Sequence, residues 1–94
     1  MVSISGEIDI ATVDEVAAAV REDLVAGPVS LDLHELSFMD SSGLRMLLGL
    51  LRESEQAGWS LTIGNELHQN VRRLLTMAGI LDMLPFDGGE PLSL

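Results

Sequence analysis

The sequence predicts a small α/β domain with a sheet of about four mostly parallel strands and three or more helices. Short segments of alternating apolar and polar residues are separated by longer segments whose apolar residues recur at helical intervals. Each helical segment is long enough to connect two parallel strands, and such crossovers are right-handed. The 94 residues, 47% of them hydrophobic, have room for one packed core and no second domain.

The first half of the chain contains two predicted strands and one helix. Residues 2–5 alternate apolar and polar side chains, which indicates a strand with one buried face. Residues 6–11 are expected to form a turn. Thr12 and Glu15 have the spacing of a capping box, and apolar residues follow at helical intervals until a Gly-Pro pair. Residues 29–33 alternate again and predict the second strand.

The second half continues the alternation of helix and strand. Residues 34–39 are expected to form a loop, and the helix that follows closes at Gly58. Residues 61–63 predict a third strand, and the next helical pattern ends at Gly79. Residues 84–86 predict a weak fourth strand at an edge of the sheet, because their central proline cannot donate a hydrogen bond. We expect the domain to cover residues 1–86, followed by a loose C-terminal tail over residues 87–94.

The composition argues against several partners and locations. Fifteen acidic residues against five basic ones give a net charge of −10, so the average surface repels nucleic acid and anionic membranes. The absence of cysteine excludes disulfides, thiolate metal sites and thiol catalysis, and it suits a reducing compartment. The N-terminus lacks a secretory signal, and the longest apolar run, residues 44–51, is too short to span a bilayer. We therefore expect a cytoplasmic protein.

One segment carries more information than the others. Ser41 and Ser42 lie between Asp40 and Gly43 at the predicted start of a helix. Asp and Ser commonly cap helices by accepting hydrogen bonds from the free amides of the first turn. A helix start also exposes its first residues and tolerates a phosphate, so a modifiable hydroxyl is the other interpretation. Capping and modification can coexist.

The sequence does not favour an enzyme. A catalytic serine needs a base within hydrogen-bond reach and a group to orient that base. His34 follows a predicted strand and His68 begins another helix, and neither spacing indicates a triad. The chain has neither a lysine nor a Gly-rich phosphate loop. We expect no catalytic residue, no metal and no cofactor.

Four short segments share an arrangement with a known family. Residues 6–9 read Gly-Glu-Ile-Asp, residues 36–44 read Leu-Ser-Phe-Met-Asp-Ser-Ser-Gly-Leu, residues 71–75 read Val-Arg-Arg-Leu-Leu and residues 77–80 read Met-Ala-Gly-Ile. With these segments the chain resembles the STAS domain of bacterial anti-sigma factor antagonists over nearly its whole length. The resemblance implies a STAS-like sheet and a phosphoacceptor at Ser41.

The resemblance also implies a partner-switching mechanism in transcription regulation and stress response. In that family, an anti-sigma factor that is itself a serine kinase phosphorylates this serine. The unphosphorylated antagonist binds the kinase and frees a sigma factor, phosphorylation ends binding, and a PP2C-like phosphatase restores it. Asp40, Ser42, Gly43 and Asp9 are then expected to support the motif, with Asp9 lying near Asp40.

The helix after the motif offers a predicted contact surface. Its core stripe is expected to contain Leu44, Leu47, Leu48 and Leu51. Met46 and Leu50 project beyond this stripe, beside a notch at Gly49, so we expect them, together with Met39, to contact the partner. The alternative is that a small domain buries them in its core.

Two departures from the family leave other interpretations open. An extra strand before residues 2–5 and a helix after the last strand are missing or cut short, as in a shortened chain. The first strand is then an open edge, which favours pairing with a second copy of the chain as a homodimer. The fold also occurs in transporters, so the alternative function is a constitutive STAS adaptor subunit of a lipid transporter, in which Ser41 only caps a helix.

Overall fold

The computed structural model describes residues 1–88. The helices are α1 (Val13–Ala26), α2 (Ser41–Ala57) and α3 (Gln69–Met77), followed by a short 3₁₀ helix, η1 (Leu81–Met83). The strands are β1 (Val2–Ser3), β2 (Gly6–Ile8), β3 (Val29–Asp32), β4 (Leu36–Met39) and β5 (Leu61–Ile63). Each pairing between these strands is parallel, which confirms the predicted α/β class.

The strands form two small parallel sheets. β1, β3 and β5 pair in the order β1-β3-β5, while β2 and β4 pair with each other. Val2 lies opposite Leu31, and Val29 lies opposite Leu61. Within residues 1–88 no strand pairs with the outer side of β1, so β1 is an edge strand there. Pairing of this edge with a second copy of the chain stays a prediction.

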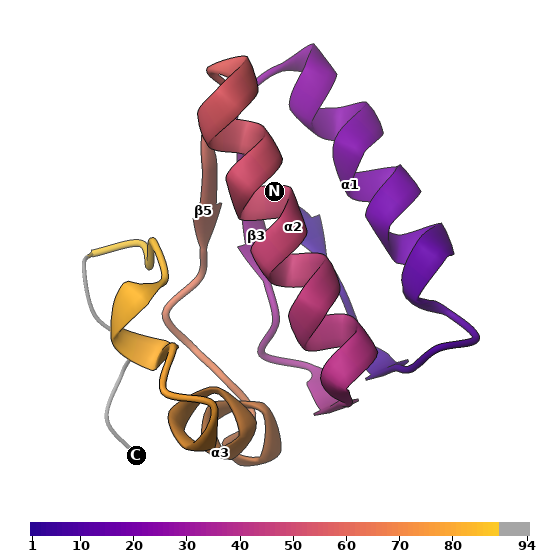
Figure 1. Cartoon of the computed structure of the whole chain (residues 1–94), viewed down its shortest axis with the longest axis vertical. Coiled ribbons are helices and arrows are strands. Elements are labelled where there is room, and N and C mark those ends of the chain that lie inside the picture. Colours follow the sequence, from indigo (N-terminus) through magenta and orange to yellow (C-terminus); the bar gives the residue numbers. More distant parts are fainter. Residues whose placement is uncertain (89–94) are drawn as a thin grey trace.

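The helices enclose one hydrophobic core. Helices α1 and α2 lie side by side over the three-stranded sheet, whereas α3 lies beyond one end of it (Figure 1). Helix α3 packs against β4, where the Asn70 side-chain amide donates a hydrogen bond to the Ser37 carbonyl at 3.2 Å. Every element except β1 and η1 contributes side chains to the most deeply buried set: Ile8, Val20, Leu24, Leu31, Leu36, Leu47, Leu50, Ile63, Val71 and Leu75.

Two strands differ from the expected turn and loop. Residues 6–11 were expected to be a turn and residues 34–39 a loop, and both predictions are wrong where β2 and β4 form. Strand β2 has a single buried side chain, Ile8, and its register with β4 shifts between Gly6 and Glu7, which leaves Ser37 of β4 as the extra residue. In β4 the buried residues are Leu36 and Met39, three positions apart. Neither strand therefore shows the strict period of two that marks a strand in a sequence.

Helix α2 buries a different line of residues from the predicted stripe. Its buried residues are Gly43, Leu47, Leu50 and Ser54. Leu48 is instead 36% exposed, and Leu44 and Leu51 are only partly buried. The helix packs against α1 and also against β4. Its buried residues therefore face the space between these two elements. Small residues such as Gly43 and Ser54 allow that close approach, and a hydrophobic pattern does not reveal them.

The start of α1 is also built differently from the prediction. Thr12 is the N-cap residue, but it makes no side-chain capping hydrogen bond, so the expected capping box with Glu15 does not form. The Thr12 hydroxyl oxygen instead accepts a hydrogen bond from the Asp9 backbone N–H at 3.0 Å. The Thr12 hydroxyl is therefore engaged by the turn before the helix and does not cap α1.

The expected fourth strand is reduced to a single bridge. Phe86 pairs in parallel with Ile63 at the outer side of β5. The Ile63 N–H donates to the Pro85 carbonyl at 2.9 Å, and the Asp87 N–H donates to the Ile63 carbonyl at 2.7 Å. Apart from Asp87 and Gly88, the predicted loose tail, residues 87–94, lies outside the described residues.

Candidate functional site

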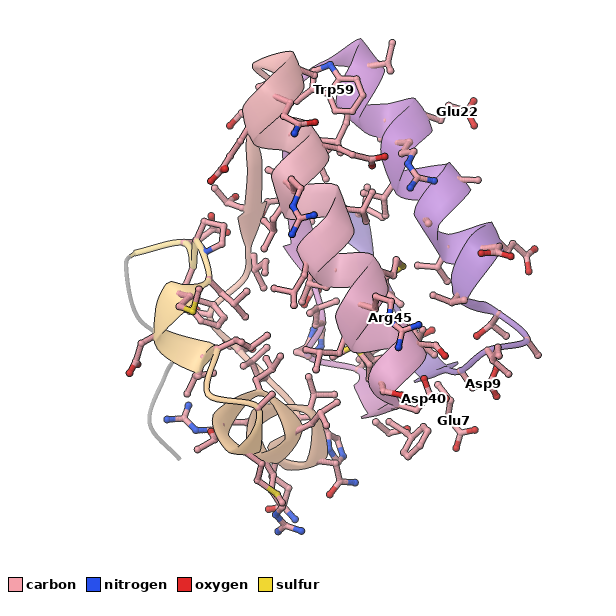
Figure 2. The ribbon with its side chains drawn as sticks, in the orientation of Figure 1. Glu7, Asp9, Glu22, Asp40, Arg45 and Trp59 are labelled. Carbon is pink, nitrogen blue, oxygen red and sulfur yellow. The ribbon has the colours of Figure 1, made fainter. Side chains whose placement is uncertain are left out.

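The site begins where β2 and β4 end. Ile8 lies opposite Met39 in this parallel pair, and the Asp40 N–H donates to the Ile8 carbonyl at 3.2 Å. The next residues along the two strands, Asp9 and Asp40, are thereby brought to the same edge. Figure 2 shows both at the end of the molecule where α2 begins, with Glu7 beside them.

Asp40 caps helix α2. Its backbone is extended, with φ −96° and ψ −170°, and its Oδ1 accepts hydrogen bonds from the N–H groups of Ser42 at 2.9 Å and Gly43 at 3.3 Å. These are the contacts that an N-cap side chain makes to the free amides of a first turn. The capping interpretation of the motif therefore applies to Asp40 and does not require either serine side chain.

The two serines occupy different surroundings. Ser41 is the first residue of α2 and its side chain is exposed to solvent. Ser42 is partly buried and lines a groove between α1 and α2. Of the two hydroxyls, the one on Ser41 is therefore more accessible to another protein.

Asp9 orders the turn that leads into α1. Its Oδ1 accepts hydrogen bonds from the N–H groups of Ala11 at 2.9 Å and Thr12 at 3.2 Å. This carboxylate is thus engaged within its own loop, as in an Asx turn. Asp9 shapes the surface beside Asp40 and adds negative charge there.

Gly43 allows α2 to pack tightly against the β2–β4 pair. A Cβ atom at this position would collide with Met39 Cγ, and it would lie 2.9 Å from Met39 Sδ and 3.0 Å from Ile8 Cγ2. The absence of a side chain at Gly43 therefore lets the first turn of α2 rest on the two residues that precede the aspartates. This contact fixes the position of the first turn of α2, and with it the Ser41 backbone, relative to β2 and β4.

The groove between α1 and α2 lies next to the motif and has a volume of about 360 Å³. Ile10, Asp14, Ser42, Arg45 and Met46 line it near the start of α2. Met46 is half-buried and also packs against the core. This groove is the surface that a partner reaching Ser41 from the side of α1 would contact.

Two of the three expected partner-contact residues are buried. Leu50 is 0% exposed and belongs to the core, so the prediction that it lies on an exposed flank is wrong. The reason is the rotation of α2, which places Leu50 on the buried line in place of Leu48. Met39 is also buried, because it lies beneath Gly43. Only Met46 reaches the groove.

Three exposed apolar residues around the motif were not expected from the sequence. Ile10 and Met77 are each 80% exposed, and Phe38 is 45% exposed. Phe38 and Met77 line a second groove of about 290 Å³ together with Leu74 and Arg73. If Phe38 had been assigned to a strand, the alternation of side chains along the strand would have predicted that it points outward, opposite to the buried residue that follows it. Ile10 is a single apolar residue in a turn, and no sequence pattern predicts its exposure.

Both histidines contact other groups. His34 Nδ1 lies 2.7 Å from Asp32 Oδ1, and this hydrogen bond is the main cause that raises the pKa of His34 and lowers that of Asp32. His68 caps α3 by accepting a hydrogen bond from the Asn70 N–H at 3.1 Å. In residues 1–88 no group of three or more metal-ligating side chains comes together. No helix in that part of the chain is long and apolar enough to cross a membrane.

The family of the chain follows from its similarity to a known domain. The model of the STAS domain matches residues 1–90. The chain belongs to the STAS domain family. A similar relative is an anti-sigma F factor antagonist from Paenibacillus polymyxa, 33% identical over 93 residues, which are 96% of this chain and 79% of the relative.

Two further relatives agree with this assignment. An anti-sigma-B factor antagonist from Bacillus subtilis is 32% identical over 88 residues, covering 88% of this chain and 76% of the relative. Among solved structures, the anti-sigma factor antagonist SpoIIAA in its unphosphorylated form superposes with a TM-score of 0.67 at 26% identity. That match covers 83% of this STAS chain and 70% of the other.

Proposed function

We propose that this STAS domain is an anti-sigma factor antagonist controlled by phosphorylation of Ser41. The unmodified chain binds an anti-sigma factor that is a serine kinase, and this binding releases a sigma factor. The phosphate on Ser41 ends binding, and a PP2C-like phosphatase reverses the change. The observation that carries the proposal is the exposed Ser41 hydroxyl, which directly follows a helix cap supplied by Asp40 alone.

The surface around Ser41 supports a binding role rather than catalysis. Exposed apolar side chains flank it on two sides, with Ile10 at the α1–α2 groove and Phe38 and Met77 at the groove between β4 and α3. Exposed apolar side chains rimmed by polar ones are typical of protein interaction surfaces. We expect a kinase that reaches Ser41 to cover at least one of these grooves.

The charge at the site explains how a phosphate can end binding. Glu7, Asp9 and Asp40 already lie together there (Figure 2), and a phosphate on Ser41 adds about −1.5 to −2 charges at pH 7. Two unit charges about 4 Å apart near a protein surface interact by about 4 kcal/mol. A hundredfold loss of affinity requires about 2.7 kcal/mol, so repulsion by one acidic group of the partner is sufficient.

Phosphate transfer from the kinase tests the assignment. The chain, Ser41→Ala and Ser42→Ala are each incubated with the cognate kinase and ATP, and the products are mapped by mass spectrometry. We expect one phosphate on the unaltered chain and on Ser42→Ala, and none on Ser41→Ala. Phosphate on Ser42 would overturn the assignment. A kinase complex without any phosphate transfer would favour a constitutive STAS adaptor, such as the subunit of a lipid transporter.

Matched surface substitutions test the contact surface. Ile10→Asp and Met77→Asp each place a charge on one side of Ser41, and Val25→Asp places one at the far end of α1, where the side chain is also highly exposed. We expect the first two variants to weaken kinase binding at least tenfold and Val25→Asp to bind as the unaltered chain does. Equal binding by all three, with unchanged melting temperatures, would place the kinase elsewhere.

A further inference from the structure

Arg45 has an unusual position in this acidic chain. It lies on α2, four residues after Ser41, and both side chains are exposed. Residues four apart on a helix are neighbours on one face, with Cβ atoms about 5–6 Å apart. An anion followed by a cation at this spacing is the more favourable of the two orders, because it also agrees with the helix dipole.

The guanidinium of Arg45 has no carboxylate partner among residues 1–88. Arg21, which lines the same groove, pairs with Glu53 at 2.9 Å. Arg52 and Arg73 likewise make no ion pair among residues 1–88, so the feature that distinguishes Arg45 is its position one helical turn after Ser41. Figure 2 shows Arg45 beside Asp40 and Asp9, at the end of α2 where the phosphate would be added.

Two of the first-turn amides of α2 are already in use. Asp40 Oδ1 accepts hydrogen bonds from the N–H groups of Ser42 and Gly43. A phosphate on Ser41 therefore competes with Asp40 for these donors, and the nearest uncommitted cationic donor on the helix face is Arg45. A guanidinium can donate two parallel hydrogen bonds to phosphate oxygens, which a single backbone amide cannot do.

We propose that Arg45 binds the phosphate of phosphorylated Ser41, so that α2 holds its own modification in an ion pair across one helical turn. This inference rests on the proposed function, in which Ser41 is the phosphoacceptor. Phosphorylation then has two effects on the docking surface, since it adds negative charge and also occupies a cation that lines the α1–α2 groove.

The other charged groups near the phosphate are acidic and disfavour its ionisation. They are present in every variant that the test compares. Glu7 comes from β2, Asp9 from the turn after it, Asp14 from α1 and Asp40 from the cap of α2. All four disfavour the phosphate dianion, whereas Arg45 favours it. The contribution of Arg45 is therefore measured as a difference between variants that all retain these acids.

The experiment installs phosphoserine at position 41 during synthesis, so it needs no kinase. The second ionisation of the phosphate is followed by phosphorus NMR against pH in the otherwise unaltered chain, in Arg45→Gln and in Arg52→Gln. Arg52 is also exposed on α2 but lies eleven residues from Ser41, about 16 Å along the helix. It is the matched control for the loss of one positive charge.

We expect the phosphate pKa to rise by about 0.15–0.4 unit in Arg45→Gln, and to change by less than about a third of that in Arg52→Gln. Arg45→Lys is expected to keep the phosphate pKa close to its value in the otherwise unaltered chain, because lysine retains the positive charge. Equal pKa values in the unaltered chain and Arg45→Gln, or equal rises in both glutamine variants, would overturn the proposal. Failure of a kinase to modify Ser41 would instead contradict the proposed function and leave this result unaffected.

Discussion

Gly43 provides the most direct test of how α2 is held against the strands. In Gly43→Ala the new methyl group would collide with Met39 Cγ and lie 3.0 Å from Ile8 Cγ2. The Met39 contact is close to its backbone, so movement of the flexible end of that side chain alone does not relieve it. Ile8 is β-branched and has little freedom of rotation. The helix or the β2–β4 pair therefore has to shift.

Two opposing terms set the size of the effect. Replacing glycine by alanine inside a helix is favourable by about 1 kcal/mol, because alanine has the higher helix propensity. Overpacking of a core contact costs about 1–3 kcal/mol. Gly49→Ala separates the two terms, because Gly49 lies on the same helix and a Cβ there meets nothing within 4 Å.

The difference between the two alanine variants measures the overpacking cost alone. We expect Gly49→Ala to be at least as stable as the unaltered chain and Gly43→Ala to be less stable than Gly49→Ala by about 1–3 kcal/mol in urea unfolding. For a domain of this size, 1 kcal/mol corresponds to about 4–8 °C in melting temperature. If Gly43→Ala were as stable as Gly49→Ala, the tight contact between α2 and the strands would be refuted.

Three further predictions follow from the cap, the histidine pair and the core. Asp40→Ala should lower the free energy of unfolding by about 1 kcal/mol in urea denaturation, because two amides lose their acceptor, while Asp40→Asn should lose less than half as much; equal losses would argue against capping. The Asp32 hydrogen bond raises the pKa of His34, so its stabilisation is complete below the unfolded-state pKa of about 6.5 and is lost as pH rises through the higher folded-state value. Proton NMR should show a lower His34 pKa in Asp32→Asn, and an unchanged value would contradict this account. Leu50→Asp should unfold the domain by circular dichroism whereas Leu48→Asp keeps it folded, since only Leu50 is fully buried, and a folded Leu50→Asp would contradict the orientation of α2.

The long helices were the most predictable part of the fold. Helix α1 was predicted from apolar residues at helical intervals, and it ends at the Gly-Pro pair, as expected. The helical spacing of its apolar residues extends over several turns, so a single exception does not obscure the pattern. The cap at Asp40 was also predictable, because the residue type and its position before a helix are local properties.

The rotation of α2 was not predictable from its sequence. Leucine occupies five positions between residues 44 and 51, so a hydrophobic pattern permits more than one buried line. The structure selects Leu50 over Leu48 because Gly43 packs beneath the same line. That choice depends on a contact between α2 and the β2–β4 pair, which no pattern within the helix contains.

The arrangement of the site depends on the two strands that the sequence did not reveal. Asp9 and Asp40 are thirty-one positions apart in the chain, and they become neighbours because Ile8 lies opposite Met39 in parallel strands. If the segments before these aspartates were a turn and a loop, nothing would fix the distance between them. With the strands paired and Gly43 resting on both, the start of α2 has a defined position relative to the α1 turn. A phosphate on Ser41 would therefore be added at a fixed place among acidic groups, as a charge-operated switch requires.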